Sequence, residues 1–195
     1  MKRLTLALAV MLAVTPLAVP SAARADIHSS LLRASPQSQA RLFGIAEPDC
    51  DKLRAQALAC LACNIYHEAR SEGRDGMRLV GKVTMNRVGS PLFPGRVCDV
   101  VWQGSAQGRP QFSWTADGRP DRVHEPEAWR EAVEAAAVMI FDHYDPDVSV
   151  RIGGRIYGSE LLWYHTRSVR PGWGSRLQKV AEVGSHVVYR SPVSN

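Results

Sequence analysis

The residues best suited to do chemistry form one polar cluster, the segment 64–73, which reads Asn-Ile-Tyr-His-Glu-Ala-Arg-Ser-Glu-Gly. Within it, Glu68 and Glu72 are about one helical turn apart. A carboxyl group that loses hydration in a cleft keeps its proton at neutral pH, as glycosidic bond cleavage by general acid catalysis requires. Two carboxyl groups at this spacing could also form a retaining pair, for which separations of about 5–5.5 Å are typical. On spacing alone, we favour the simpler interpretation that both cap the helix or pair with Arg70 and Arg74.

Helices are expected first along the chain, and strands only in its last third. Apolar residues recur at helical spacing from Leu53 to Ile65, which predicts a helix that is capped by Asp49 or Asp51 and runs to about Arg70. This order of elements favours an α+β fold. Further helices are predicted at 75–88, within 91–102 and at 127–141, and short strands within 148–156, 161–165 and 180–189, with a hairpin turn at Gly184-Ser185.

Between the third and the last predicted helix, residues 104–124 are rich in Gly, Pro and polar residues, which predicts a long loop. A loop of this length inside a compact domain is usually functional or mobile. The sequence leaves open whether it closes over a substrate. Trp129, on the Ala-rich helix that follows, is expected to pack in the core.

The N-terminus, residues 1–25, has the pattern of a secretory signal peptide. Lys2 and Arg3 precede a nearly continuous apolar run that ends at Val19, and Ala23-Arg24-Ala25 offers a small-x-small cleavage site. The run falls short of the ~20 apolar residues of a membrane span. We therefore expect an exported protein, periplasmic or extracellular, with no stable membrane anchor after cleavage; an uncleaved anchor is the alternative.

Cleavage would also change the charge of the protein. Residues 1–25 contain three basic residues and no acidic one, so their removal lowers the formal net charge from +5 to +2. A strongly basic surface for nucleic acid is therefore not expected. We expect residues 26–48 to be a linker or a short docking segment and residues 49–195 to form one compact domain of a length usual for a single domain.

Four cysteines, Cys50, Cys60, Cys63 and Cys98, would enter an oxidising compartment, where an even number favours disulfides. Three pairings are open. The Cys60-x-x-Cys63 spacing also occurs in zinc and redox motifs, but no second such pair accompanies it. His67-Glu68 matches the start of a zinc protease helix, yet the second histidine of that motif is replaced by Ser71. No metal and no cofactor are expected.

Short motifs occur in a fixed order over about residues 58–190. They are the segments 64–72, 75–77, Val83–Val88, Phe93–Cys98, Gln111–Trp114, Trp129, Trp163–His165, Pro171–Trp173 and Val183–His186. Any one motif alone is a weak signal, but together they resemble the SleB/CwlJ-type cell wall hydrolase family. The resemblance implies a small lysozyme-like fold and cleavage of peptidoglycan glycan strands between N-acetylmuramic acid and N-acetylglucosamine.

The same resemblance assigns the family's catalytic glutamate to Glu68. The implied reaction is that of a lytic transglycosylase, in which one general acid and base leaves a 1,6-anhydro-muramic end; hydrolysis remains possible if water reaches the site. Because one carboxyl group suffices, Glu72 is expected to be structural or electrostatic. Asn86-Arg87 could contact the substrate, or Arg87 could pair with Glu72, and we favour the pairing. The residues expected to contact the glycan strand are Tyr66, Phe112, Trp114, Tyr164 and His165.

Some of these contacts have a structural alternative. Phe112 and Trp114 fit a cleft and a core equally well, since aromatic residues dominate both. His165 and His186 match family positions, but lone histidines more often belong to a hydrogen-bonded framework.

The cysteine positions depart from the family, whose members carry additional cysteines around segment 111–114. We expect Cys60 to pair with Cys98, linking the first helix to the loop after the second, and this leaves Cys50 with Cys63.

Two competing functions stay open. One is a zinc amidase that cuts the stem peptide with His165, His186 and a carboxylate. The other is a non-catalytic wall-binding module. No protein partner is indicated.

Overall fold

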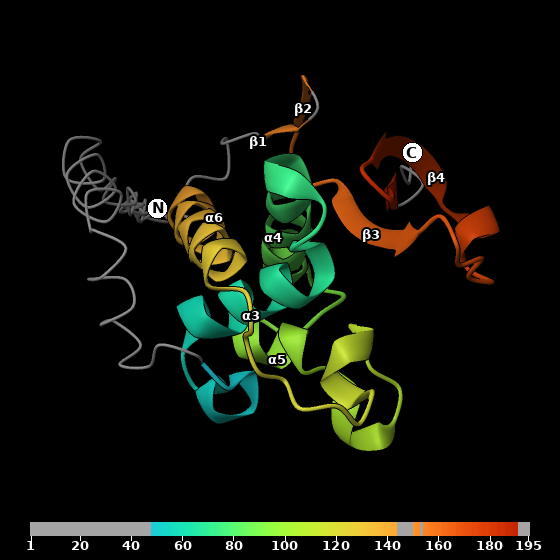
Figure 1. Ribbon diagram of the computed structural model, residues 1–195. Coiled ribbons are helices and arrows are strands. Elements are labelled where there is room, and N and C mark those ends of the chain that lie inside the picture. Colours follow the sequence, from blue (N-terminus) through green and yellow to red (C-terminus); the bar gives the residue numbers. More distant parts are fainter. Residues whose placement is uncertain (1–47, 144–149, 153, 191–195) are drawn as a thin grey trace, which may run out of the picture.

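The computed structural model describes residues 48–143, 150–152 and 154–190, which form a helical half followed by a β half (Figure 1). The expected signal peptide and the segment 26–47 lie outside the described residues. Within the described part, no helix is both long and apolar enough to cross a bilayer. The expected α+β fold is confirmed.

The helical half is built around α3 (Ala57–Ala69), against which α4 (Gly73–Gly89) and α6 (Pro126–His143) pack (Figure 1). Its apolar positions recur at helical spacing, so Leu61 and Ile65 on α3 and Leu79 and Val83 on α4 are fully buried. Trp129 is buried, as expected. The helices are η1 (Cys50–Leu53), α3 (Ala57–Ala69), α4 (Gly73–Gly89), α5 (Val97–Val101), η2 (Ser105–Gln107), η3 (Ser113–Ala116) and α6 (Pro126–His143), where η marks a 3-10 helix.

The first helix begins later than predicted. Residues 50–53 form a separate 3-10 turn, and α3 begins only at Ala57, with no side-chain cap from Asp49. Backbone hydrogen bonds explain the difference, since the amide of Cys50 donates to the carbonyl of Asp121, and Val123 donates to Pro48. The chain before α3 is thus held in a bridge to the end of the long loop, and this tertiary contact overrides the helical pattern.

The β half consists of two antiparallel sheets. The strands β1 (Val150–Ile152) and β2 (Arg155–Tyr157) pair in one, so the strand expected within 148–156 is two strands that turn at Gly154, with φ 79°. The other sheet has the order β3-β5-β4. Its strands are β3 (Leu161–Thr166), β4 (Gln178–Val183) and β5 (His186–Arg190), with the predicted hairpin turn at Gly184-Ser185 and the 3-10 turn η4 (Gly174–Arg176) before β4.

The two halves are joined through buried polar side chains of α4. The amide nitrogen of Asn86 donates to the carbonyls of Gly158, at 3.0 Å, and Leu161, at 2.8 Å. Arg87 Nε donates to the carbonyl of Leu162 at 2.9 Å. Side chains of α4 thereby fix the start of β3.

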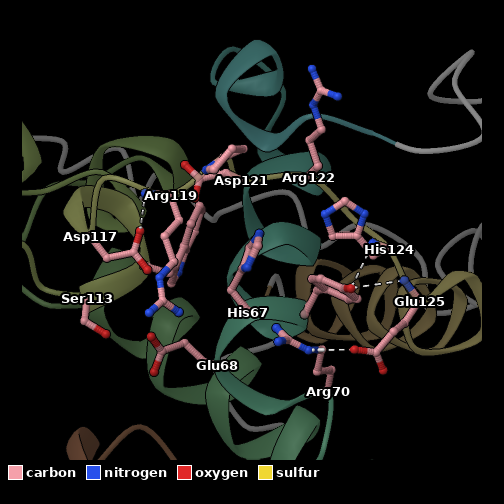
Figure 2. Close-up of a pocket in the computed structure, with 13 residues that line it drawn as sticks. His67, Glu68, Arg70, Ser113, Asp117, Arg119, Asp121, Arg122, His124 and Glu125 are labelled. Atoms are coloured by element: carbon pink, nitrogen blue, oxygen red, sulfur yellow. Dashed lines mark hydrogen bonds and ion pairs between the residues drawn. The ribbon is translucent and has the colours of Figure 1, made fainter.

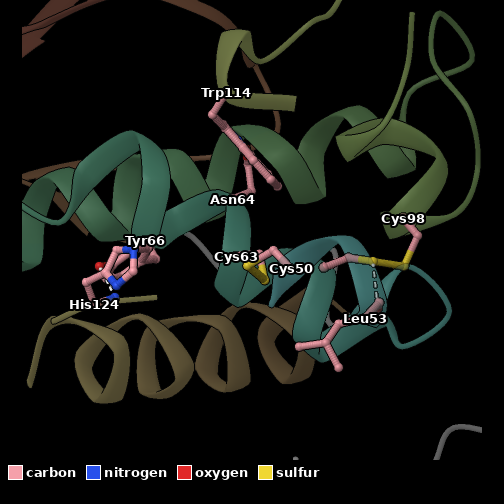
Figure 3. Close-up of a disulfide and its surroundings, with 9 residues drawn as sticks. Cys50, Leu53, Cys63, Asn64, Tyr66, Cys98, Trp114 and His124 are labelled. Carbon is pink, nitrogen blue, oxygen red and sulfur yellow. Dashed lines mark hydrogen bonds between the residues drawn. A yellow bond between two sulfur atoms is a disulfide. The ribbon is translucent and has the colours of Figure 1, made fainter. Parts of the chain in front are cut away.

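Disulfides join Cys50 to Cys63 and Cys60 to Cys98, the two pairs expected from the sequence (Figure 3). Both cysteines of the Cys-x-x-Cys segment are therefore engaged in different disulfides. Because cross-links reduce the entropy of the unfolded chain, loops of 13 and 38 residues correspond to about 3 and 4 kcal/mol of stabilisation.

The long loop 104–124 is anchored rather than free. Trp114 and Val123 are buried, and Trp114 Nε1 donates to Asn64 Oδ1 on α3 at 3.0 Å (Figure 3). The hydroxyls of Ser105 and Thr115 bond to each other at 2.6 Å. These contacts hold the loop beside the C-terminal end of α3.

Candidate active site

A polar pocket of about 340 Å³ lies between the C-terminal end of α3 and the loop that leads to α6 (Figure 2). Glu68, Asp117 and Arg119 gather at one end of the pocket, Arg122 and Glu125 at the other (Figure 2). The remaining lining residues are Tyr66, His67, Arg70, Ser113, Trp114, Pro120, Asp121 and His124.

Glu68 is half-buried in the last turn of α3, and its carboxyl group faces the β half. Tyr164 from β3 donates a hydrogen bond from its hydroxyl to Glu68 Oε2 at 3.0 Å. Burial raises the pKa of Glu68 above its ordinary value, while the Tyr164 hydrogen bond and the charge of Arg87 oppose that rise. The net effect is an acid that holds its proton at higher pH than an exposed glutamate.

Tyr164 is itself fixed by its surroundings. Its ring meets the ring of His186 edge-on at 4.9 Å, and burial followed by the charge of Glu68 raises the pKa of the phenol well above its ordinary value. Tyr164 is therefore a hydrogen-bond donor at any pH at which the protein would work. His186, on β5, is buried and neutral at pH 7, because burial lowers its pKa.

The predicted pair between Glu72 and Arg87 is wrong. Glu72 accepts hydrogen bonds from the backbone amide of Ser185 at 2.7 Å and from its hydroxyl at 2.6 Å. The hydroxyl bond is the main reason that the pKa of Glu72 is lowered. A Cβ on Gly184, at φ 56°, would lie 2.1 Å from Glu72 Oε2, so glycine permits this close approach. Glu72 thus ties the start of α4 to the β4–β5 hairpin.

Arg87 instead lies on the buried side of α4. Its guanidinium lies 5.0 Å from the ring of Phe93 and 5.1 Å from that of Phe112. Of the two alternatives for Phe112, a cleft or the core, the structure places it in the core, since it is 2 % exposed and does not line the pocket.

His67 lies in the middle of the pocket, stacked on the ring of Trp114 at 4.5 Å (Figure 2). Burial and the nearby charge of Arg70 lower the pKa of His67 to about 4, so its ring is neutral at pH 7. Trp114 is only 6 % exposed and also bonds to Asn64. These two rings form a rigid, largely uncharged wall next to Glu68.

The opposite end of the pocket is fixed by Tyr66. Its hydroxyl accepts hydrogen bonds from the backbone amides of His124, at 3.1 Å, and Glu125, at 3.2 Å. Arg70 pairs with Glu125 at 2.9 Å (Figure 2). Since the Tyr66 ring is 2 % exposed, the residue shapes the wall and offers little of its face to a ligand.

His165 lies apart from this pocket, in an aromatic group of the β half. Its Nδ1 donates to the carbonyl of Thr166 at 2.8 Å, and its Nε2 and the hydroxyl of Tyr189 are hydrogen-bonded at 2.9 Å. The ring of Trp173 packs against it at 5.7 Å. Both nitrogens are thus occupied within the protein. The described residues contain no group of three side chains placed to hold a metal.

Several site residues were not predicted from the sequence. Asn64 could have been recognised, because a polar residue on the apolar face of a helix must find a buried partner. Asp117, Arg119 and Asp121 carry no local signal, since only the course of the loop brings them to α3. Asp121 is 6 % exposed, and burial, followed by the charges of Asp51 and Asp117, raises its pKa to about 6.

Residues 71–189 match the family described as Cell Wall Hydrolase. Since the match covers more than half of the chain, the chain belongs to this family. The matched segment begins just after Glu68. The match therefore establishes the family but does not include Glu68, whose role is argued from the geometry of the site.

The chain is also similar to spore cortex-lytic enzymes. It is 26 % identical over 130 residues to that of Oceanobacillus iheyensis, covering 65 % of this chain and 39 % of the relative. It is 28 % identical over 127 residues to that of Bacillus subtilis, covering 65 % of this chain and 35 % of the relative. The chain thus spans well under half the length of these relatives. No solved structure gives a significant match, so lysozyme-like character stays an expectation.

Proposed function

We propose that the protein is an exported lytic transglycosylase that cleaves peptidoglycan glycan strands, with Glu68 as the general acid and base. The observation that carries the proposal is the half-buried Glu68 carboxyl group, which has a raised pKa, bonds to Tyr164 and lines a polar pocket. Family membership and the cell-wall relatives support the substrate class.

In the first step, Glu68 gives its proton to the oxygen that links N-acetylmuramic acid to N-acetylglucosamine, and the bond from that oxygen to the anomeric carbon breaks. The C6 hydroxyl of the muramic acid then forms a bond to the same carbon and returns its proton to Glu68. The product carries a 1,6-anhydro end, no water is consumed, and the enzyme regains its starting protonation state.

This route needs only one carboxyl group, and the surroundings of Glu72 support it. Both oxygens of Glu72 accept hydrogen bonds from Ser185, so this carboxylate is held by the hairpin. Glu72 is therefore a structural residue in the proposal, and Glu68 is the proton donor. Two disulfides support export, because disulfides persist in oxidising compartments.

The test is the mass spectrometry of products released from purified sacculi. The unaltered protein should release anhydro-muropeptides, and Glu68→Gln should lower the rate on the order of 10²–10⁴-fold, the usual contribution of general acid–base catalysis. Glu127→Gln is the matched control, since Glu127 is exposed on α6 and pairs only with Arg130 among the described residues.

Other products would overturn the proposal in distinct ways. Full activity of Glu68→Gln would remove its proton donor, and reducing ends would indicate hydrolysis. Free stem peptides would indicate the amidase. Binding to sacculi with no soluble product would indicate a wall-binding module.

A further inference from the structure

Arg87 is a buried cation that makes no direct ion pair with any residue the structure describes. Its side chain is 4 % exposed, and its Nη1 atom has no hydrogen-bond partner among the described residues. An uncompensated charge in a protein interior is costly, because the surroundings replace little of its hydration. The position therefore calls for a compensating interaction.

The guanidinium is fixed in place by its neighbours. Nε donates to the carbonyl of Leu162 at 2.9 Å, on the strand that also carries Tyr164. The rings of Phe93 and Phe112 lie at 5.0 and 5.1 Å from its central carbon, within the range of cation–π attraction. Arg87 thus has a defined position against β3, the strand that carries Tyr164, and little freedom to leave it.

The carboxyl group that interacts electrostatically with the charge of Arg87 is that of Glu68. The electrostatic attraction of Arg87 reaches both Glu68 and the Tyr164 hydroxyl bound to it. In a poorly hydrated interior, a charge acts over longer distances than in water, so a direct contact is not needed. The three groups come from α4, α3 and β3 and are linked through the ring of Phe112. This ring lies 5.1 Å from the central carbon of the Arg87 guanidinium and 6.5 Å from the ring of Tyr164, whose hydroxyl bonds to Glu68.

The positive charge of Arg87 is more favourable after Glu68 has given up its proton than before. While Glu68 holds its proton, the buried charge of Arg87 faces no carboxylate partner within the described part of the chain. When Glu68 gives up its proton, a negative charge develops near a fixed positive one. An interaction that strengthens as charge develops lowers the barrier, and one that is preorganised needs no rearrangement.

We propose that Arg87 is a positioning residue for the reaction, a fixed buried cation that stabilises the Glu68 carboxylate formed when the proton is transferred. This inference rests on the proposed function. It assigns Arg87 no contact with substrate, because its orphaned Nη1 atom is buried.

Removing the charge should also change the pH dependence. Arg87 lowers the pKa of Glu68 against the effect of burial, so its loss raises that pKa further. Other ionisable groups near Glu68 come from each element around it. They are His67 on α3, Arg70 at its end, Glu72 at the start of α4, Asp117, Arg119 and Asp121 on the loop, Tyr164 on β3 and His186 on β5.

The experiment compares Arg87→Gln, Arg87→Met and Arg87→Lys with the unaltered protein on sacculi across pH. The neutral variants should lower kcat at least tenfold, leave KM within about threefold and move the alkaline limb of the profile upward by about one pH unit. Arg87→Lys, which keeps the charge, should recover most of kcat and the original limb. Arg78→Gln, on the exposed side of the same helix, is the matched control.

Circular dichroism first establishes which variants fold, and Arg87→Met provides an uncharged variant should Arg87→Gln unfold. A folded neutral variant with an unchanged alkaline limb overturns the inference, as does a folded Arg87→Lys no better than Arg87→Gln. Should both neutral variants unfold, a folded Arg87→Lys with the original limb supports the role of the charge, and one whose kcat falls tenfold overturns it. Full activity of Glu68→Gln would refute the proposed function itself, whatever Arg87 does.

Discussion

The hydroxyl of Tyr164 and the carboxyl group of Glu68 are bonded at 3.0 Å, although 96 residues separate them in the chain. The bond joins the last turn of α3 to β3, and so connects the helical half to the β half at the proposed proton donor. Asn86 and Arg87 of α4 fix the same strand through its backbone carbonyls. The acid is therefore positioned by both halves together.

Tyr164→Phe should move the alkaline limb of the activity profile to higher pH. The Tyr164 hydrogen bond favours the charged form of Glu68, so its loss raises the pKa of Glu68. A hydrogen bond to a charged group corresponds to about one to two pH units. Tyr189→Phe is the control, since its hydroxyl bonds to His165 instead. If the alkaline limb of the activity profile does not move in Tyr164→Phe, the Tyr164 hydrogen bond does not set the pKa of Glu68.

Glu72→Gln should lower the free energy of unfolding at pH 7 by about 1–2 kcal/mol, because it weakens two bonds to Ser185 and Glu72 stays partly exposed. The folded state lowers the pKa of Glu72 below its ordinary value of 4.5. The stabilisation is therefore present above pH 4.5 and is lost as the pH falls through the lower, folded value. Urea unfolding of both proteins at pH 7 and pH 3 measures this.

The control for Glu72→Gln is Glu127→Gln, which removes a carboxylate from an exposed ion pair and should change stability little. An equal effect of the two substitutions would contradict the assigned role of Glu72.

His67 should make the protein less stable in mild acid. Its pKa is about 4 when folded and 6.5 in its ordinary state, so the unfolded chain takes up a proton first as the pH falls below 6.5. Between pH 7.5 and 4.5 this corresponds to a loss on the order of 2 kcal/mol. Urea unfolding should show that His67→Gln lacks this loss, whereas His124→Gln, at an exposed position, keeps it. Identical pH dependence in all three proteins would show that His67 is not buried as a neutral ring.

The predictions of individual helices and turns that held depend on local pattern. Apolar residues at helical spacing predicted α3, α4 and α6, and Gly184-Ser185 predicted the β4–β5 turn, because these signals arise from neighbours along the chain. The predicted start of α3 was wrong, because the hydrogen bonds that join Pro48 and Cys50 to the loop are long-range contacts that no local pattern predicts.

The sequence by itself determined the α+β order, the polar cluster around Glu68 and the motifs that indicate the family. Only the tertiary structure decided which groups surround that glutamate. Glu72 and Arg87 carry opposite charges and were expected to pair, yet Ser185 binds the first, and the second is buried among aromatic rings. Burial and long-range contacts set the protonation of a carboxyl group, and both arise only when distant segments pack together.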